Sequence, residues 1–148
     1  MPLRGSFRCG PVSWTNWCWK AARPKPPVTS WTSLTSWGFQ WAPHLQRWPD
    51  RVSAALLRTE TARALRRSGN DALIGKARRL FGGLVLIRID EPLLDRAGDL
   101  GPAELRALDA VHLAAALSVG PDLGVLLTYD ICLRDAAATQ GLDVESPS

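Results

Sequence analysis

Residues 103–118 read AELRALDAVHLAAALS, and residues 124–130 read GVLLTYD. The first stretch is rich in alanine and leucine, and its apolar residues recur at helical spacing, which predicts a helix closed by Gly120. The second stretch is a short apolar run of the kind found in strands buried in a sheet. A packed helix that leads into a buried strand favours an α/β fold.

The segments on either side of this pair alternate in the same way. Predicted helices cover residues 52–67, 70–80, 91–100 and 131–140, and predicted strands cover residues 84–89 and 142–145. Such alternation predicts a parallel sheet with helices on its faces. Binding sites of these sheets gather at the carboxyl ends of the strands.

The first 49 residues have a different composition. All seven Trp lie between residues 14 and 48, and no Asp or Glu precedes Asp50. Residues 1–49 therefore carry a net charge of +6 and residues 50–148 carry −2, so the chain is not a uniformly basic nucleic-acid binder. We expect a boundary near residue 50 between a Trp/Pro/Arg-rich leader (residues 1–49) and a globular domain (residues 50–148).

The leader shows no helical or strand period, although residues 31–37 have strand propensity. Trp has the single codon TGG, which arises when Leu codons of a GC-rich gene are read one frame off, and 15 Arg against 3 Lys indicate such a gene. We interpret residues 1 to about 41 as the product of a frameshift or a misassigned start, without a selected fold. The alternative is a segment that contacts nucleic acid or a membrane surface.

The chain shows no sign of export or membrane insertion. No apolar run approaches the length that spans a bilayer, and no secretory signal precedes a cleavage site. The three cysteines, Cys9, Cys18 and Cys132, lack metal-type spacing. We therefore expect a cytoplasmic protein with free thiols, a Cys9–Cys18 disulfide being the alternative.

Asp109 interrupts the apolar pattern of its helix. It falls on the same arc as Leu105 and His112, and a carboxylate on a packing face needs a partner or a cation. The simpler alternative is an Asp satisfied by a local hydrogen bond or by Arg106. His112 is assigned to packing and hydrogen bonding with neighbouring elements.

Two further acids lie at informative positions. Asp130 follows the strand GVLLT, at a carboxyl end where a site is expected, and it is also a suitable N-cap for the next helix. Thr128 offers a hydroxyl beside it. Glu60 lies at the edge of its predicted helix, where pairing with Arg63 or Arg67 is the common alternative. Acids that converge on one point favour a Mg²⁺ site, and such a site is typical of nucleases.

Three stretches resemble the PIN-domain ribonucleases of the VapC toxin family: VSAALLRTETARAL, LRALDAVHLAAAL and LLTYDICLRDAAATQGLDV. The resemblance covers residues 50–148 and implies a three-layer α/β/α fold with a central, mostly parallel sheet. It implies a metal-dependent endoribonuclease in which Glu60, Asp109 and Asp130 are catalytic and bind Mg²⁺ or Mn²⁺. The implied partners are RNA, a cognate antitoxin protein and a second copy of the chain.

Other residues have weaker assignments. Thr128 and Asp135 are candidate supporting residues, although a solvated or capping role suits Asp135 better. Arg58, Arg63 and Arg106 are candidate contacts to the RNA backbone, each with a solvated helix face as the alternative.

The resemblance departs from the family at the N-terminus. The family begins with a central apolar strand that ends in an Asp, the first metal ligand, whereas the leader contains no Asp. We therefore expect the first strand to be absent or aberrant, the cation to be bound weakly, and the edges beside an unfilled slot to be unpaired. The alternative function is a catalytically dead PIN-like module that binds antitoxin or RNA.

Overall fold

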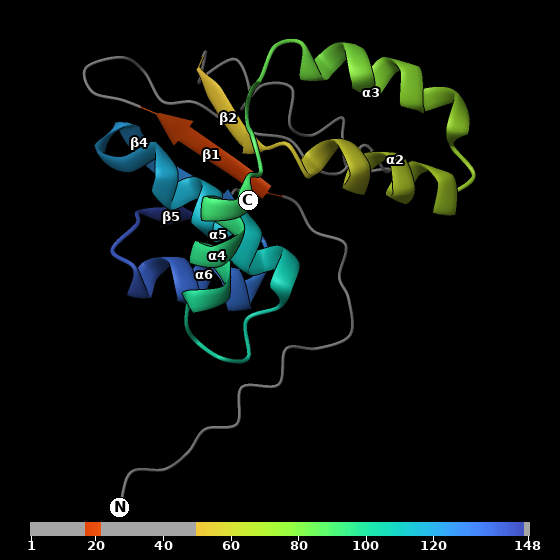
Figure 1. The fold of residues 1–148 in the computed structure, drawn as a ribbon. Helices are drawn as coiled ribbons and strands as arrows, with labels where there is room; N and C mark the ends of the chain where they lie inside the picture. The colour runs from red at the N-terminus through yellow and green to blue at the C-terminus, as the bar shows by residue number, and fades with distance from the viewer. Residues whose placement is uncertain (1–16, 22–49, 147–148) are drawn as a thin grey trace, which may run out of the picture.

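The structure is a computed structural model that describes the backbone of residues 17–21 and residues 50–146 (Figure 1). Its elements in chain order are β1 (Trp17–Ala21), β2 (Arg51–Ala54), α2 (Leu57–Arg67), α3 (Ile74–Phe81), β3 (Val85–Ile87), α4 (Glu91–Asp99), α5 (Ala107–Val119), β4 (Leu123–Thr128), α6 (Ile131–Thr139) and β5 (Val144–Glu145). Short 3-10 turns at Asp71–Leu73 and Gly120–Asp122 join neighbouring elements.

The five strands form one sheet in the order β3-β2-β1-β4-β5. β2 pairs in parallel with β3, and β4 pairs in parallel with β5. β1 is antiparallel to both β2 and β4, so the other four strands all point the same way. The predicted α/β class and the mostly parallel sheet are confirmed.

β1 fills the central position of the sheet with backbone from the leader. Trp19 pairs with Val52 on one side and with Leu126 on the other. The expectation of an unfilled slot with unpaired edges is therefore wrong. The strand is nevertheless aberrant in direction, because Trp17 pairs with Thr128 and β1 thus begins at the edge where the other strands end.

The start of the globular domain is a strand, where a helix over residues 52–67 was predicted. Residues 51–54 form β2, and α2 begins only at Leu57. Val52, Ser53 and Ala54 are buried and pair with β3. Strand preference depends on such cross-strand packing, so the local helical pattern does not decide the conformation here.

α4, α5 and α6 lie together on one side of the sheet (Figure 1). Their apolar core joins Leu113 of α5 and Leu133 of α6 to Val52 of β2 and Leu126 of β4. Residues 113–116 of α5 are fully buried, and three of them are alanines, which let the helix pack closely against its neighbours. Burial of one leucine such as Leu113 contributes about 1.5–3 kcal/mol.

α2 and α3 form a helical hairpin (residues 57–81) that extends away from the sheet (Figure 1). Its own apolar cluster contains Leu57, Leu65, Ala77 and Phe81, with Leu86 of β3 packed against it. Ile87, the next residue of β3, packs instead against the core of α5. The hairpin is therefore held near the sheet by a cluster separate from the main core.

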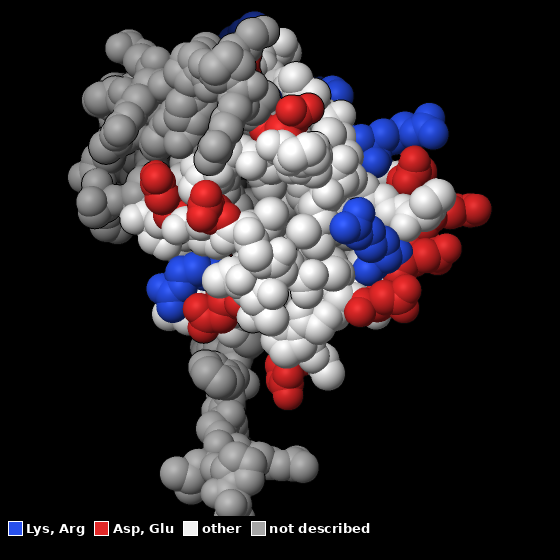
Figure 2. Space-filling view, turned by 90° about the vertical axis from the view of Figure 1, so that its left-hand side faces the viewer, with Lys and Arg blue, Asp and Glu red and all other residues white. Residues whose placement is uncertain are grey.

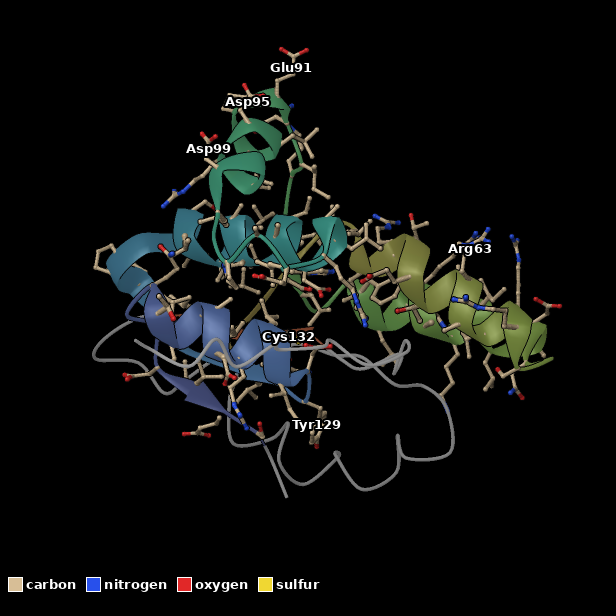
Figure 3. The ribbon with its side chains drawn as sticks, turned by 90° about the horizontal axis from the view of Figure 1, so that it is seen from below. Arg63, Glu91, Asp95, Asp99, Tyr129 and Cys132 are labelled. Atoms are coloured by element: carbon tan, nitrogen blue, oxygen red, sulfur yellow. The ribbon has the colours of Figure 1, made fainter. Side chains whose placement is uncertain are left out.

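The hairpin is also the basic part of the described domain. It carries seven Lys/Arg and two Asp/Glu, whereas residues 82–148 carry four Lys/Arg and eleven Asp/Glu. Figure 2 views the side away from the hairpin and shows acidic side chains gathered along one edge, next to a broad uncharged area. In Figure 3, Glu91, Asp95 and Asp99 project outward from α4. The charges therefore favour the approach of a polyanion at the hairpin and oppose it at α4.

The expectations of free thiols and of no membrane-spanning segment can be compared with the described residues only. Cys132, near the start of α6, is disulfide-bonded, so the expectation of free thiols is wrong for this residue. The side chains of Cys9 and Cys18 lie outside the described part, as do residues 31–37. Within residues 50–146, no helix has the length and apolar character needed to cross a membrane.

Candidate metal centre

The three predicted acids come from the ends of elements that meet at one edge of the sheet. Glu60 lies in the first turn of α2, which follows β2, and Asp130 separates β4 from α6. Asp109 lies in the first turn of α5. Because β2 and β4 point the same way, the chain leaves both strands at their shared carboxyl edge, where sites of this architecture are found.

Asp109 is the most perturbed group of the site. Its side chain is buried, with the residue 6 % exposed, and its Oδ2 has no hydrogen-bond partner among the described residues. The pKa of Asp109 is raised to about 6, mainly by burial and then by the negative charge of Asp130; Arg106 opposes the shift, and Glu60 adds a smaller rise. Asp130 and Glu60 thus lie near enough to Asp109 for their charges to act on its carboxyl group.

Asp130 has the capping role that its position allows. Its Oδ1 accepts a hydrogen bond of 3.0 Å from the backbone N–H of Leu133, which caps α6. The backbone N–H of Asp130 donates to Oγ1 of the buried Thr128 at 3.0 Å. The carbonyl oxygen of Thr128 in turn accepts a hydrogen bond of 2.7 Å from Ser146. Thr128 therefore helps to hold the turn that carries Asp130.

Glu60 is held by a residue distant in sequence. Its Oε2 lies 2.9 Å from Nε2 of His112, which is fully buried on α5. The predicted packing and hydrogen-bonding role of His112 is confirmed. Sequence spacing directed attention to Arg63 and Arg67 as partners of Glu60, and it missed this contact. The sequence placed His112 one helical turn after Asp109 on the same arc, but nothing in it pointed to Glu60 as the partner.

The remaining predicted residues lie outside this group. Asp135 is exposed and pairs with Arg134 at 3.0 Å, in keeping with its solvated alternative. Arg58 and Arg63 are exposed on α2, and Figure 3 shows Arg63 on the hairpin, away from Tyr129 and Cys132 at the start of α6. Arg106 is half-buried and acts electrostatically on Asp109.

The carboxylates are suitable ligands for a divalent cation, but they form only an incomplete ligand set. Among the described residues, no three or more His, Cys, Asp or Glu side chains are assembled closely enough to hold a metal. One oxygen of Glu60 is engaged by His112, one oxygen of Asp130 caps α6, and the leader has no acid to add. The buried, unpartnered Oδ2 of Asp109 remains an atom that a cation would stabilise, because a buried carboxylate is costly without a positive partner.

The sheet, the helices on it and the acids at its carboxyl edge together define a PIN-like domain. The chain is 52 % identical to Ribonuclease VapC46 of Mycobacterium tuberculosis over 98 residues, which are 66 % of this chain and 75 % of that protein. It is 37 % identical to Ribonuclease VapC47 over 98 residues (66 % and 72 %) and 33 % identical to Ribonuclease VapC35 over 103 residues (68 % and 73 %), both of Mycobacterium tuberculosis. The chain belongs to the VapC family of PIN-domain ribonucleases. No protein-family profile and no solved structure matches it significantly.

Proposed function

We propose that this chain is a toxin-type endoribonuclease in which Glu60, Asp109 and Asp130 hold Mg²⁺ or Mn²⁺. The observation that carries the proposal is the buried carboxylate of Asp109, whose Oδ2 has no partner among the described residues and whose pKa is raised by burial and by the charges of the other two acids. Mg²⁺ and Mn²⁺ bind carboxylate oxygens, and a bound cation would offset the repulsion between the three carboxylates. When bound, the ion lowers the pKa of a water and offsets charge on the phosphodiester.

Each candidate site residue has a defined task in this proposal. Asp109 anchors the ion from α5, and Asp130 supplies a second carboxylate whose position is set by its cap on α6. Glu60 adds a third carboxylate from α2. Arg58 and Arg63, exposed on the basic hairpin, attract the RNA backbone toward the same edge of the sheet, and Arg106 lies beside Asp109.

The second candidate is a catalytically dead module that still binds antitoxin or RNA. It is favoured by the incomplete ligand set and by the direction of β1, which starts rather than ends at the acidic edge. If the chain is an active endoribonuclease, the same two features predict weak cation binding and slow cleavage.

The names of the relatives guide the proposed partners. Each relative is named a VapC ribonuclease, so we propose RNA as substrate, a small antitoxin protein as inhibitor and a second copy of the chain as dimer partner. We further propose a cytoplasmic location. Residues 50–148 would be the working PIN-like domain, and residues 1–49 an out-of-frame leader that supplies backbone to the sheet but no catalytic residue.

Purified full-length protein, structured RNA and Mn²⁺ provide the test. We expect slow cleavage that disappears with a chelator and in Asp109→Asn, and that persists in Asp135→Asn, which changes a solvated acid. A folded wild type that binds RNA without cutting it would establish the dead module instead. Cleavage that survives both the chelator and Asp109→Asn would refute the metal-dependent mechanism.

A further inference from the structure

The hydrogen bond between Glu60 and His112 joins two parts of the molecule that have separate cores. Glu60 belongs to α2, whose buried leucines, Leu57 and Leu65, pack within the hairpin cluster. His112 belongs to α5, whose neighbours Leu113 and Ala116 pack within the main core. The 2.9 Å contact therefore fixes a side chain of the projecting hairpin against the most deeply buried helix.

The two partners differ in how firmly their surroundings hold them. His112 is fully buried, so its ring has a fixed position, whereas the side chain of Glu60 is 24 % exposed. A glutamate has three rotatable bonds, and immobilising such a side chain costs conformational entropy. A fixed donor at Oε2 offsets this cost and selects one orientation of the carboxylate.

The chemistry of the contact sets the direction of the hydrogen bond. An ionised carboxylate only accepts, so the tautomer that suits this contact has its hydrogen on Nε2 of His112, and Nε2–H donates the hydrogen bond to Oε2 of Glu60. His112 and Asp109 are three residues apart on α5 and thus lie one turn apart on the same side of the helix. A single rigid helix therefore presents Asp109 directly and determines the place of Glu60 through His112.

We propose that His112 is a positioning residue that orients Glu60 relative to Asp109 in the cation site. The inference rests on the proposed function for its catalytic consequence, but the orientation of Glu60 can be measured without any metal. Loss of a group that orients a metal ligand typically lowers metal affinity or activity by about 10- to 100-fold.

A matched pair of variants separates positioning from a purely structural role. In His112→Gln the side-chain amide nitrogen reaches about as far as Nε2 and can donate to Glu60, whereas in His112→Asn the amide reaches only as far as Nδ1. Both variants place a neutral amide in the same buried site, so both are expected to lose a similar amount of stability. Only the asparagine variant loses the contact.

The measurements are Mn²⁺ affinity by titration calorimetry and the order of the Glu60 carboxylate by ¹³C NMR relaxation, on full-length protein. We expect Glu60 to be ordered in the wild type and in His112→Gln and mobile in His112→Asn. Mn²⁺ affinity should fall by about 10- to 100-fold in His112→Asn and by less than about 3-fold in His112→Gln. Equal order and equal affinity in the two variants would overturn the proposal.

Failure of the proposed function and failure of this inference give different results. If the wild type binds no Mn²⁺, the metal site is refuted, and the NMR order of Glu60 alone decides whether His112 positions it. If His112→Asn does not fold, Glu60→Gln and Glu60→Ala replace it. The Nε2–H signal of His112 should then remain protected from exchange in Glu60→Gln, whose amide oxygen accepts, and become unprotected in Glu60→Ala. Protection in both would contradict the contact.

Discussion

Glu60 and His112 are 52 residues apart in the sequence, yet Oε2 of the glutamate lies 2.9 Å from Nε2 of the histidine. The contact connects the basic hairpin to the helix that carries Asp109, and it brings the third acid to the edge where Asp130 caps α6. The three candidate acids thus come from three separate segments of the chain. The same few contacts are expected to affect both the stability of the fold and cation binding at the site. Matched substitutions are therefore needed to separate the two effects.

His112→Ala should destabilise the protein by about 2–4 kcal/mol, because it removes a buried hydrogen bond to a charged group and leaves a cavity. Urea unfolding followed by circular dichroism measures the change. Arg134→Ala is the control, since it removes an exposed pair with Asp135 and should cost no more than about 1 kcal/mol. Equal effects of the two substitutions would show that the Glu60–His112 contact is not a structural link.

Asp109→Asn should stabilise the metal-free protein near pH 7.5 by about 3 kcal/mol, at roughly 1.4 kcal/mol per unit of pKa shift. The pKa of Asp109 is raised from 3.8 to about 6 on folding, so the protonated carboxyl favours the folded state. That contribution is fully present below about pH 4 and is lost as the pH rises through 6. The difference between variant and wild type, measured by urea unfolding with a chelator present, should therefore shrink as the pH falls from 7.5 to 4. A difference that does not change with pH would mean that Asp109 has an ordinary pKa.

Asp130 combines two roles that two substitutions distinguish. Asp130→Asn keeps an oxygen that can accept from the N–H of Leu133, so the cap and the stability should be largely preserved while Mn²⁺ affinity falls. Asp130→Ala removes the cap as well and should cost about 1 kcal/mol more in thermal or urea unfolding. Full Mn²⁺ affinity in Asp130→Asn would exclude this carboxylate from the site.

The hairpin arginines should contribute to RNA binding without contributing to the chemistry. Arg58→Ala combined with Arg63→Ala should weaken RNA binding and flatten its dependence on salt, because each phosphate contact releases counterions. Fluorescence anisotropy at several salt concentrations measures both quantities. Arg96→Ala on the acidic helix α4 is the control and should leave the salt dependence unchanged. An equal RNA affinity and salt dependence in the two variants would show that the hairpin is not part of the RNA-binding surface.

Much of the fold follows from local pattern, and the exceptions have physical causes. The sequence predicted α3, α4, α5 and α6 to within a few residues of their observed ends. Apolar spacing and the glycines that end helices are local signals. Residues 52–54 were predicted as the start of a helix, since VSAALL suits either conformation and only the pairing with β3 selects a strand. β1 has no local signal that marks it, and its place depends on two neighbouring strands.

The acids of the candidate site could be proposed from the sequence one by one, but their arrangement in space could not. Asp109 was conspicuous as a carboxylate on an apolar helical face, and Asp130 as an acid directly after a buried strand. The partner of Glu60 could not be inferred, because spacing along one helix identifies only neighbours on that helix. His112 reaches Glu60 through the packing of α5 against the sheet, which is a property of the whole fold.

The central claim is that Glu60, Asp109 and Asp130 form one cation site, and Mn²⁺ titration of the full-length protein tests it most directly. Calorimetry or the electron paramagnetic resonance signal of free Mn²⁺ would be followed for the wild type, Glu60→Gln, Asp109→Asn, Asp130→Asn and the exposed control Asp135→Asn. The account predicts one weak site in the wild type and in Asp135→Asn, with affinity reduced at least about 10-fold in each of the other three. Binding that is unchanged by all three substitutions, or a wild type that binds no Mn²⁺ while folded, would contradict it.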